Sequence, residues 1–215
     1  MFKLNPYDTT YENRVAASDV PHRVTLSGIW ELPFGHERRF GANVNQFTDA
    51  FIGGWSVQAI GQIQSGQPVS FHDRNIYFAG DLSALKTDYS GDTNSPVFDI
   101  SGFYFHDAAV QTNGVDDPVK QRADPRIRLA SNVRYFPSRV EGLRSPKLNL
   151  WDISLIKQLR ATDRVRAQFH AEFLNAFNRP VYANFNTDPT NADFGKVTSQ
   201  TNLPRDIQLA VKLIF

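Results

Sequence analysis

The sequence predicts an all-β fold: a segment of an antiparallel up-and-down transmembrane β-barrel, with about five membrane strands and long extracellular loops. Five stretches alternate apolar and polar residues with a period of two, which is typical of strands. The connections between them alternate in length, as they do in outer-membrane barrels. No window holds the eighteen or more apolar residues of a membrane helix. If the chain crosses a membrane, strands must do so.

The clearest of these stretches is the last one, 205–215. Every second residue from Ile207 to Phe215 is apolar, whereas Gln208 and Lys212 lie between them. A barrel strand has this pattern because one face meets lipid and the other meets a polar lumen. Phe215 is then expected at the membrane interface. A half-buried strand of a soluble sandwich would show the same alternation, so this strand alone leaves both interpretations open.

Two further membrane strands are expected at 22–34 and 54–71, the second continuing beyond Pro68. Trp30 and Trp55 are expected at the periplasmic ends of these strands, where an aromatic girdle belongs. Three glutamines share one face of the second strand. An unpaired amide in a dry core costs about 1–3 kcal/mol, so a wet lumen suits them better. The expected lumen-facing residues here are Gln58, Gln62 and Gln64.

The remaining two membrane strands are expected at 147–159 and 164–177. Trp151 begins the apolar row of the first and is expected at the membrane interface. The second strand alternates small or aromatic residues with charged and amide side chains, a row that is either solvated or lumenal. The expected lumen-facing residues of this pair are Asp152, Arg166, Gln168, His170 and Glu172.

Residues 1–21 and 72–146 are expected to be extracellular loops, because they are polar and rich in turn residues. Short strands are expected within the second loop at 98–105 and 132–136. Both ends of a bacterial barrel lie in the periplasm, so the connection before the last strand is external. When each external connection is compared with the neighbouring periplasmic one, the external connection is the longer in both cases.

Several polar residues in the long loop resemble catalytic or calcium-binding groups. A solvated loop explains them better, because none reaches the spacing of a calcium loop. Neither a metal site nor a cofactor site is expected, and we expect no enzymatic activity. The acidic and histidine candidates are His106, Asp107, Asp116, Asp117, Asp88 and Asp92. The arginines that could meet lipopolysaccharide, or simply form a mixed-charge surface, are Arg122, Arg126, Arg128, Arg134, Arg139 and Arg144.

Composition limits the partners. A net charge of +1 argues against a nucleic-acid partner. The absence of cysteine excludes disulfides and thiolate metal sites. No apolar segment follows Lys3, so the first residues do not resemble a signal peptide. The expectation is that the protein either stays where it is made or is the tail of a longer precursor.

A set of motifs resembles the distal barrel of TonB-dependent outer-membrane receptors, closest to the Oar-like group. The resemblance covers nearly the whole chain. It is carried by Asp19–Arg23, Leu26–Gly35, Gly53–Trp55, Gln64–Pro68, Trp151–Leu155, Gln168–Pro180, Phe194–Val197 and Ile207–Phe215. It implies a 22-stranded barrel that encloses a plug domain and is energised by TonB. Five strands cannot close such a barrel, and the plug and TonB box are missing, so the chain is expected to be the C-terminal portion of a receptor.

The leading functional hypothesis is therefore TonB-dependent uptake of a scarce solute through the outer membrane. The expected partners are outer-membrane lipid, the other barrel strands and plug of the same receptor, and the TonB complex. One alternative is a soluble β-sandwich or open-barrel module that binds glycan or peptide. Another is an enzyme that works from the long loop through His106.

Overall fold

The computed structural model describes residues 11, 13–71, 76–90, 92, 94–107, 117–127, 133–160 and 165–215. The chain divides into two compact units. The strand unit consists of His22–Gln64, Leu148–Val181 and Asn202–Phe215. The loop unit consists of Met1–Pro21, Ser65–Lys147 and Tyr182–Thr201. No helix among the described residues is long and apolar enough to cross a membrane.

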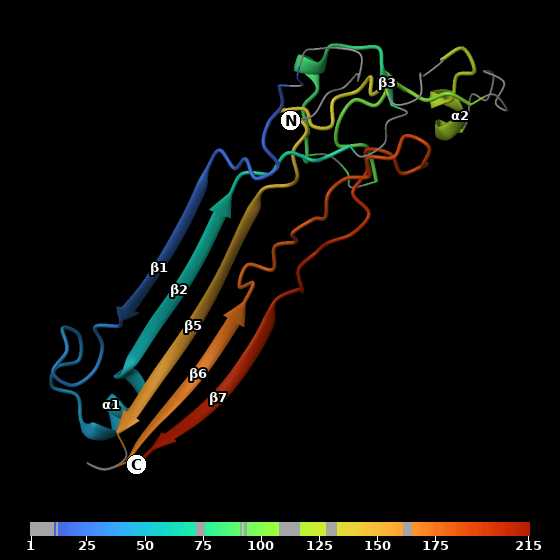
Figure 1. The fold of residues 1–215 in the computed structure, drawn as a ribbon. Helices are drawn as coiled ribbons and strands as arrows, with labels where there is room; N and C mark the ends of the chain where they lie inside the picture. The colour runs from blue at the N-terminus through green and yellow to red at the C-terminus, as the bar shows by residue number, and fades with distance from the viewer. Residues whose placement is uncertain are drawn as a thin grey trace. The chain divides into compact units, whose positions relative to one another are not determined.

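The strand unit is one five-stranded sheet in which every pair of neighbours is antiparallel (Figure 1). The spatial order β1-β2-β5-β6-β7 follows the chain, so the topology is up-and-down. The strands are β1 (Arg23–Glu31), β2 (Trp55–Gln64), β5 (Leu148–Arg160), β6 (Arg166–Leu174) and β7 (Asp206–Ile214).

The register of the four strand pairs keeps the apolar and polar rows on separate faces. Directly paired residues lie on the same face of a sheet, and successive residues lie on opposite faces. Leu26 pairs with Gly61 and Gly61 with Trp151, whereas Gln58 pairs with Ser154 and Ser154 with Glu172. The apolar face carries Val24, Leu26, Trp30, Trp55, Val57, Ile63, Trp151, Ile153, Leu155, Phe169, Phe173, Ile207, Leu209, Val211 and Leu213. The polar face carries Arg23, Thr25, Glu31, Gln58, Gln62, Gln64, Asp152, Ser154, Gln158, Arg160, Arg166, Gln168, His170, Glu172, Gln208 and Lys212. It also carries some apolar residues, namely Ile29, Ile60, Leu148, Leu150, Ile156, Leu174 and Ile214.

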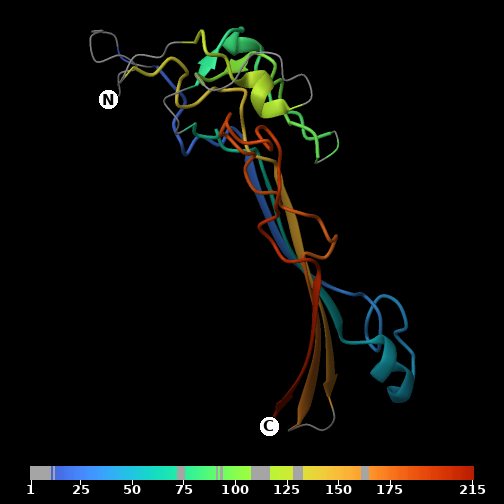
Figure 2. The same cartoon turned by 90° about the vertical axis from the view of Figure 1, so that its right-hand side faces the viewer.

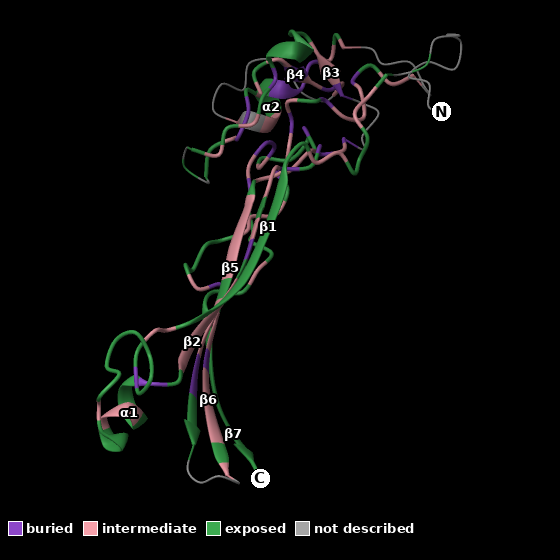
Figure 3. Cartoon of the chain, turned by 90° about the vertical axis from the view of Figure 1, so that its left-hand side faces the viewer, coloured by how far each residue is buried: buried purple, intermediate pink, exposed green. Residues whose placement is uncertain are grey.

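The sheet is a single layer when it is seen close to its edge (Figure 2). Every residue of the edge strands β1 and β7 is exposed (Figure 3), including Leu26 at 50% and Leu209 at 67%. A contiguous row of exposed apolar side chains marks a protein or membrane contact. The described residues of the strand unit contain no second sheet that could pack on this one to form a sandwich core.

A short helix, α1 (Gln46–Ile52), lies in the connection between β1 and β2. Asn45 caps it, because its side chain accepts a hydrogen bond of 2.8 Å from the backbone N–H of Thr48. The sequence predicts no helix here. Seven residues are too few for a readable helical period.

The loop unit contains a core of aromatic side chains held by mostly irregular backbone. Phe103 is completely buried, and its ring lies 5.2 Å from those of Phe136 and Phe194 and 4.7 Å from that of Phe78. The core residues are Val69, Phe71, Ile76, Leu85, Val97, Phe98, Phe103, Phe136, Val140, Leu143, Phe185, Phe194 and Val197. They come from two separate connections, so the two loops fold together.

Regular elements in the loop unit are short: β3 (Tyr77–Phe78), β4 (Phe103–Tyr104), η1 (Leu82–Ala84) and α2 (Pro118–Arg122). The short strand expected at 98–105 is reduced to β4, which pairs with β3. The strand expected at 132–136 is wrong for its described part, residues 133–136, which have irregular backbone.

The expected continuation of the second membrane strand to residue 71 is also wrong, because β2 ends at Gln64. Val69 and Phe71 are buried in the aromatic core of the loop unit, at 4% and 1% exposure. Their alternation therefore reflects burial in the core of the loop unit and not a lipid-facing row.

Candidate functional site

The polar face of the sheet is the candidate functional surface, and it carries all eight residues that the sequence analysis assigned to a lumen. Gln58 and Glu172 both pair with Ser154, and Gln168 lies between Gln158 and Lys212. His170 lies between Ile156 and Ala210. The register thus brings the eight onto one surface; that this surface borders a lumen stays a prediction.

The charges of this face are not neutralised by their direct neighbours in the sheet. Arg166 lies opposite Arg160 on one side and Ile214 on the other. Like charges placed directly opposite each other destabilise a sheet. Glu172 has the neutral neighbours Ser154 and Gln208. The face therefore presents charges that an opposing surface, an ion or a solute could neutralise.

Several members of the polar face form hydrogen bonds within the strand unit. The Gln62 amide donates to Gln64 Oε1 over 3.1 Å, so these two glutamines are linked along one strand. Asp152 Oδ1 accepts from the backbone N–H of Asn175 over 2.8 Å. Asp152 therefore fixes the end of β6 as well as adding charge to the face.

Asn175 is a buried polar residue that the sequence analysis did not identify. It has a φ of 50°, which asparagine tolerates better than most residues. Its side-chain amide donates to the carbonyls of Arg179 and Leu203 over 3.0 and 3.2 Å, and its Oδ1 accepts from the Arg179 N–H. These bonds fix the start of the connection between β6 and β7. An asparagine directly after a strand is the signal that could have predicted this turn.

The four aromatic residues assigned to a membrane interface lie along the apolar row or just beyond it. Trp30 is the second-last residue of β1 and Trp55 the first of β2, so both lie at the same end of the sheet. Phe215 follows β7 directly and is 90% exposed. Trp151 lies toward the opposite end, opposite Gly61.

Gly61 provides the space for the Trp151 ring. A Cβ at this position would lie 2.5 Å from the ring carbons, closer than real contacts allow. The Trp151 indole also lies edge-on to Phe177, with ring centroids 6.4 Å apart. The glycine thus lets a large aromatic lie flat over the apolar face near one end of the sheet.

A family model described as "Outer membrane beta barrel domain" matches residues 1–208. The chain belongs to this outer membrane β-barrel domain family. The protein is accordingly located in the outer membrane, where it has a transport-related role. No curated protein and no solved structure matches the chain. The outer-membrane location is incompatible with the soluble β-sandwich or open-barrel alternative.

In the loop unit of this barrel domain, three of the acidic candidates form turns or a helix cap. Asp88 accepts from the Ser90 N–H over 2.8 Å, and Asp92 accepts from the Asn94 N–H over 3.1 Å. Asp117 caps α2 through the N–H groups of Val119 and Lys120. Asp116 lies outside the described residues. Within the described part of the chain, no three metal-binding side chains gather.

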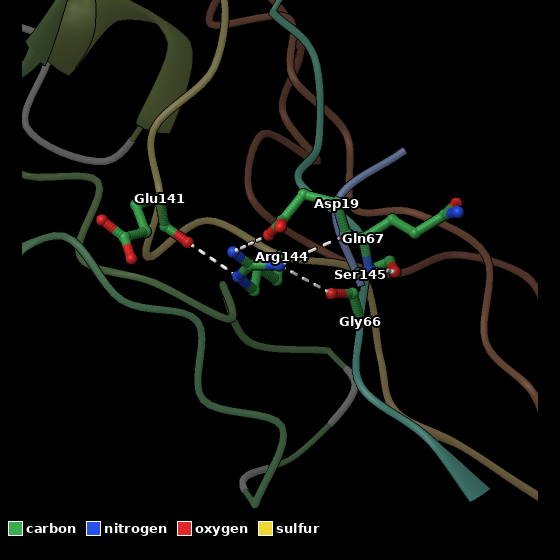
Figure 4. A network of polar contacts seen from close by, with 6 residues as sticks. All are labelled: Asp19, Gly66, Gln67, Glu141, Arg144 and Ser145. Atoms are coloured by element: carbon green, nitrogen blue, oxygen red, sulfur yellow. Dashed lines mark hydrogen bonds and ion pairs between the residues drawn. The ribbon is translucent and has the colours of Figure 1, made fainter. Parts of the chain in front are cut away.

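Arg144 ties three segments of the loop unit together (Figure 4). Its guanidinium forms an ion pair of 2.6 Å with Asp19 and donates to the carbonyl oxygens of Gly66 and Glu141 over 3.1 and 2.9 Å. The Tyr89 hydroxyl donates to the Arg144 carbonyl over 2.6 Å. Burial raises the pKa of the Tyr89 phenol above its ordinary value of 10.

Other loop arginines also have structural partners. Arg122 is 5% exposed, donates to the carbonyls of Pro189 and Asn191, and lies 5.2 Å from the Phe194 ring. Arg134 donates to the Phe71 carbonyl over 2.8 Å. These contacts show that Arg122, Arg134 and Arg144 hold segments of the loop unit together. Arg128 lies outside the described residues.

Proposed function

We propose that this chain forms part of the wall and external loops of a TonB-dependent receptor of the Oar-like group, which takes up a scarce solute across the outer membrane. The motifs from Asp19–Arg23 to Ile207–Phe215 support the receptor type, and the family supports the barrel. Transport requires no bond-making by this chain, so we expect no turnover.

The observation that carries the proposal is the separation of the two rows across all four strand pairs. In a single-layered sheet, a face whose row is apolar between Asn149 and Lys157 is best matched by an apolar solvent, and lipid provides it. The opposite face, with glutamine, arginine, histidine and glutamate side chains, then lines an aqueous lumen. A shift of one residue in any single pair would mix the two rows.

The proposed sidedness follows from the topology. One end of the sheet contains the first residues of β1, β5 and β7 and the last residues of β2 and β6. The chain segments joined to that end are the ones that make up the loop unit. In outer-membrane barrels the long connections are external. The loop unit would therefore form part of the solute entrance.

Two features favour a larger barrel with a plug. The outer edges of β1 and β7 have no neighbouring strand among the described residues, and a barrel closes by pairing such edges. The opposed Arg160 and Arg166 would be stabilised by an acidic surface on the lumen side. Additional strands of the same receptor would pair the two edges, its plug domain would supply the acidic surface, and TonB would act on the plug.

Uptake can be tested in the host cells without knowing the solute. We would compare strains that lack this protein, or lack TonB, on media limited in turn for iron chelates, oligosaccharides and peptides. The proposal predicts that a growth defect caused by loss of the protein is reproduced by loss of TonB. A growth defect in the strain that lacks this protein, without the same defect in the strain that lacks TonB, would exclude TonB-dependent uptake.

The enzyme alternative has its own test. If turnover were found, His106→Ala should abolish it in an enzyme that works from the long loop, whereas the transport proposal predicts no turnover before or after this change.

A further inference from the structure

The connection between β1 and β2 exposes a cluster of aromatic side chains that neither the sheet nor the transport proposal uses. The rings form two pairs, Phe34 with Phe40 at 5.6 Å and Phe47 with Phe51 at 5.2 Å between centroids. Phe47 is 74% exposed and Phe51 64%. We refer to these four phenylalanines as the aromatic platform. Exposed apolar groups of this kind mark a contact surface.

The aromatic platform has a well-defined backbone. The N–H groups of Gly35 and Phe40 donate to the carbonyls of Phe40 and Pro33, both over 2.9 Å. The Asp49 side chain accepts from the His36 N–H, which links α1 to this turn. The rings are therefore presented by an ordered surface, and ordering them on binding would cost little entropy.

The side chains of Trp55 and Lys157 fix the aromatic platform to one side of the sheet. Both residues belong to the apolar face and pair with each other. The Trp55 indole N–H donates to the Phe51 carbonyl over 2.8 Å, and Lys157 Nζ donates to the Gly53 carbonyl. Helix α1 thus lies on the side of the apolar face; Figure 2 shows the helix to one side of the sheet.

This position decides between possible partners. A plug or a solute would occupy the lumen, which is the polar side of the sheet. The surface that is continuous with the aromatic platform is instead the row that contains Trp30 and Trp55. Nearby, Arg39 lies 5.5 Å from the Phe40 ring, which places a cation beside the rings, where lipid phosphates can pair with it.

We propose that the aromatic platform is a membrane anchor that inserts Phe47 and Phe51 into the headgroup–acyl boundary of the outer-membrane leaflet nearest the turn between β5 and β6. Its partner is phospholipid. Amphipathic helices that lie in this boundary insert their apolar side chains by about 5–10 Å. The inference rests on the proposed lipid contact of the apolar face and extends it to a connection outside the strands.

The chain contains no cysteine, so single cysteines can carry an environment-sensitive fluorophore. Four variants of the full chain would be reconstituted in phosphatidylethanolamine–phosphatidylglycerol vesicles with brominated acyl chains: Phe47→Cys, Asn43→Cys, Leu209→Cys and Gln208→Cys. Asn43 is an exposed polar residue of the same connection. Leu209 and Gln208 are adjacent residues on the apolar and polar faces of β7.

We expect bromine to quench the labels at Phe47 and Leu209 strongly and those at Asn43 and Gln208 weakly. Quenching at Leu209 without quenching at Phe47 would overturn the anchor and leave the membrane face intact. Equal quenching at Leu209 and Gln208 would overturn the proposed function itself. If the cysteine at position 47 could not be labelled, and if it crosslinked to another protein whether or not vesicles were present, the platform would be a protein-binding surface. That result would also overturn the anchor.

Discussion

Replacing Leu155 with arginine tests the proposed lipid contact most directly. Leu155 lies near the middle of β5 on the apolar face, between Val57 and Ala171. Along this row, Asn149 and Lys157 are the polar residues that bracket the apolar ones. The arginine would therefore be placed within the apolar segment of the strand.

The position in the membrane sets the size of the effect. Asn149 and Lys157 are eight residues apart (157 − 149). At about 3.4 Å per residue this is ~27 Å along the strand, or ~21 Å along the membrane normal at a tilt of about 40°. Because the apolar band is about 25 Å tall and Leu155 lies ~5 Å from its middle, the arginine should cost about 2–4 kcal/mol.

The free energy of unfolding of the protein in phospholipid vesicles, measured by urea titration, checks this value. Ser154→Arg is the matched control, because Ser154 lies on the polar face opposite Glu172. It should change the free energy by about 1 kcal/mol or less, since a lumenal charge stays hydrated. Similar costs for the two variants, or a larger cost for Ser154→Arg, would refute the assignment of the two faces.

Three other changes test the core, a turn and the apolar face. Phe103→Ala should lower the stability of the loop unit by about 3–5 kcal/mol, measured by amide hydrogen exchange, because the ring is completely buried. The Arg126 side chain holds the pKa of the Asp124 carboxyl at about 2, so Asp124 favours folding above its ordinary pKa, and this contribution is lost as the pH falls toward 2. Arg126→Ala should raise that pKa toward 3.8 in an NMR titration. Gly61→Ala should displace the Trp151 ring and cost about 1–3 kcal/mol of unfolding free energy.

Each of these expectations has a contrary result. Leu82 is 40% exposed in the same unit as Phe103, so Leu82→Ala should change exchange little, and equal effects would contradict the proposed core. An unchanged Asp124 titration after Arg126→Ala would show that another group sets the pKa. Unchanged stability after Gly61→Ala would contradict the close contact with the Trp151 ring.

The five-stranded sheet could be predicted from sequence because the faces of each strand differ in chemistry. The row Val165–Phe173 alternates so strictly that a single register satisfies it, and the structure pairs it accordingly. The residues of the polar face were identified for the same reason. Their partners could not be read from one strand, which is why the opposed Arg160 and Arg166 emerged only from the pairing.

The folded core of the loop unit could not be predicted in this way. Its phenylalanines are held by turns, so they follow neither the period of two nor that of 3.6, and Val69 and Phe71 resembled a strand. The density of aromatic residues between 71 and 136 was the available signal. A solvated loop has no physical need for so many of them.

The composition of the aromatic core limits the order in which the protein can assemble. Phe103 contacts Phe194, and both β5 and β6 lie between these residues in the chain. The connection between β2 and β5 therefore cannot complete its hydrophobic core until the connection between β6 and β7 packs against it.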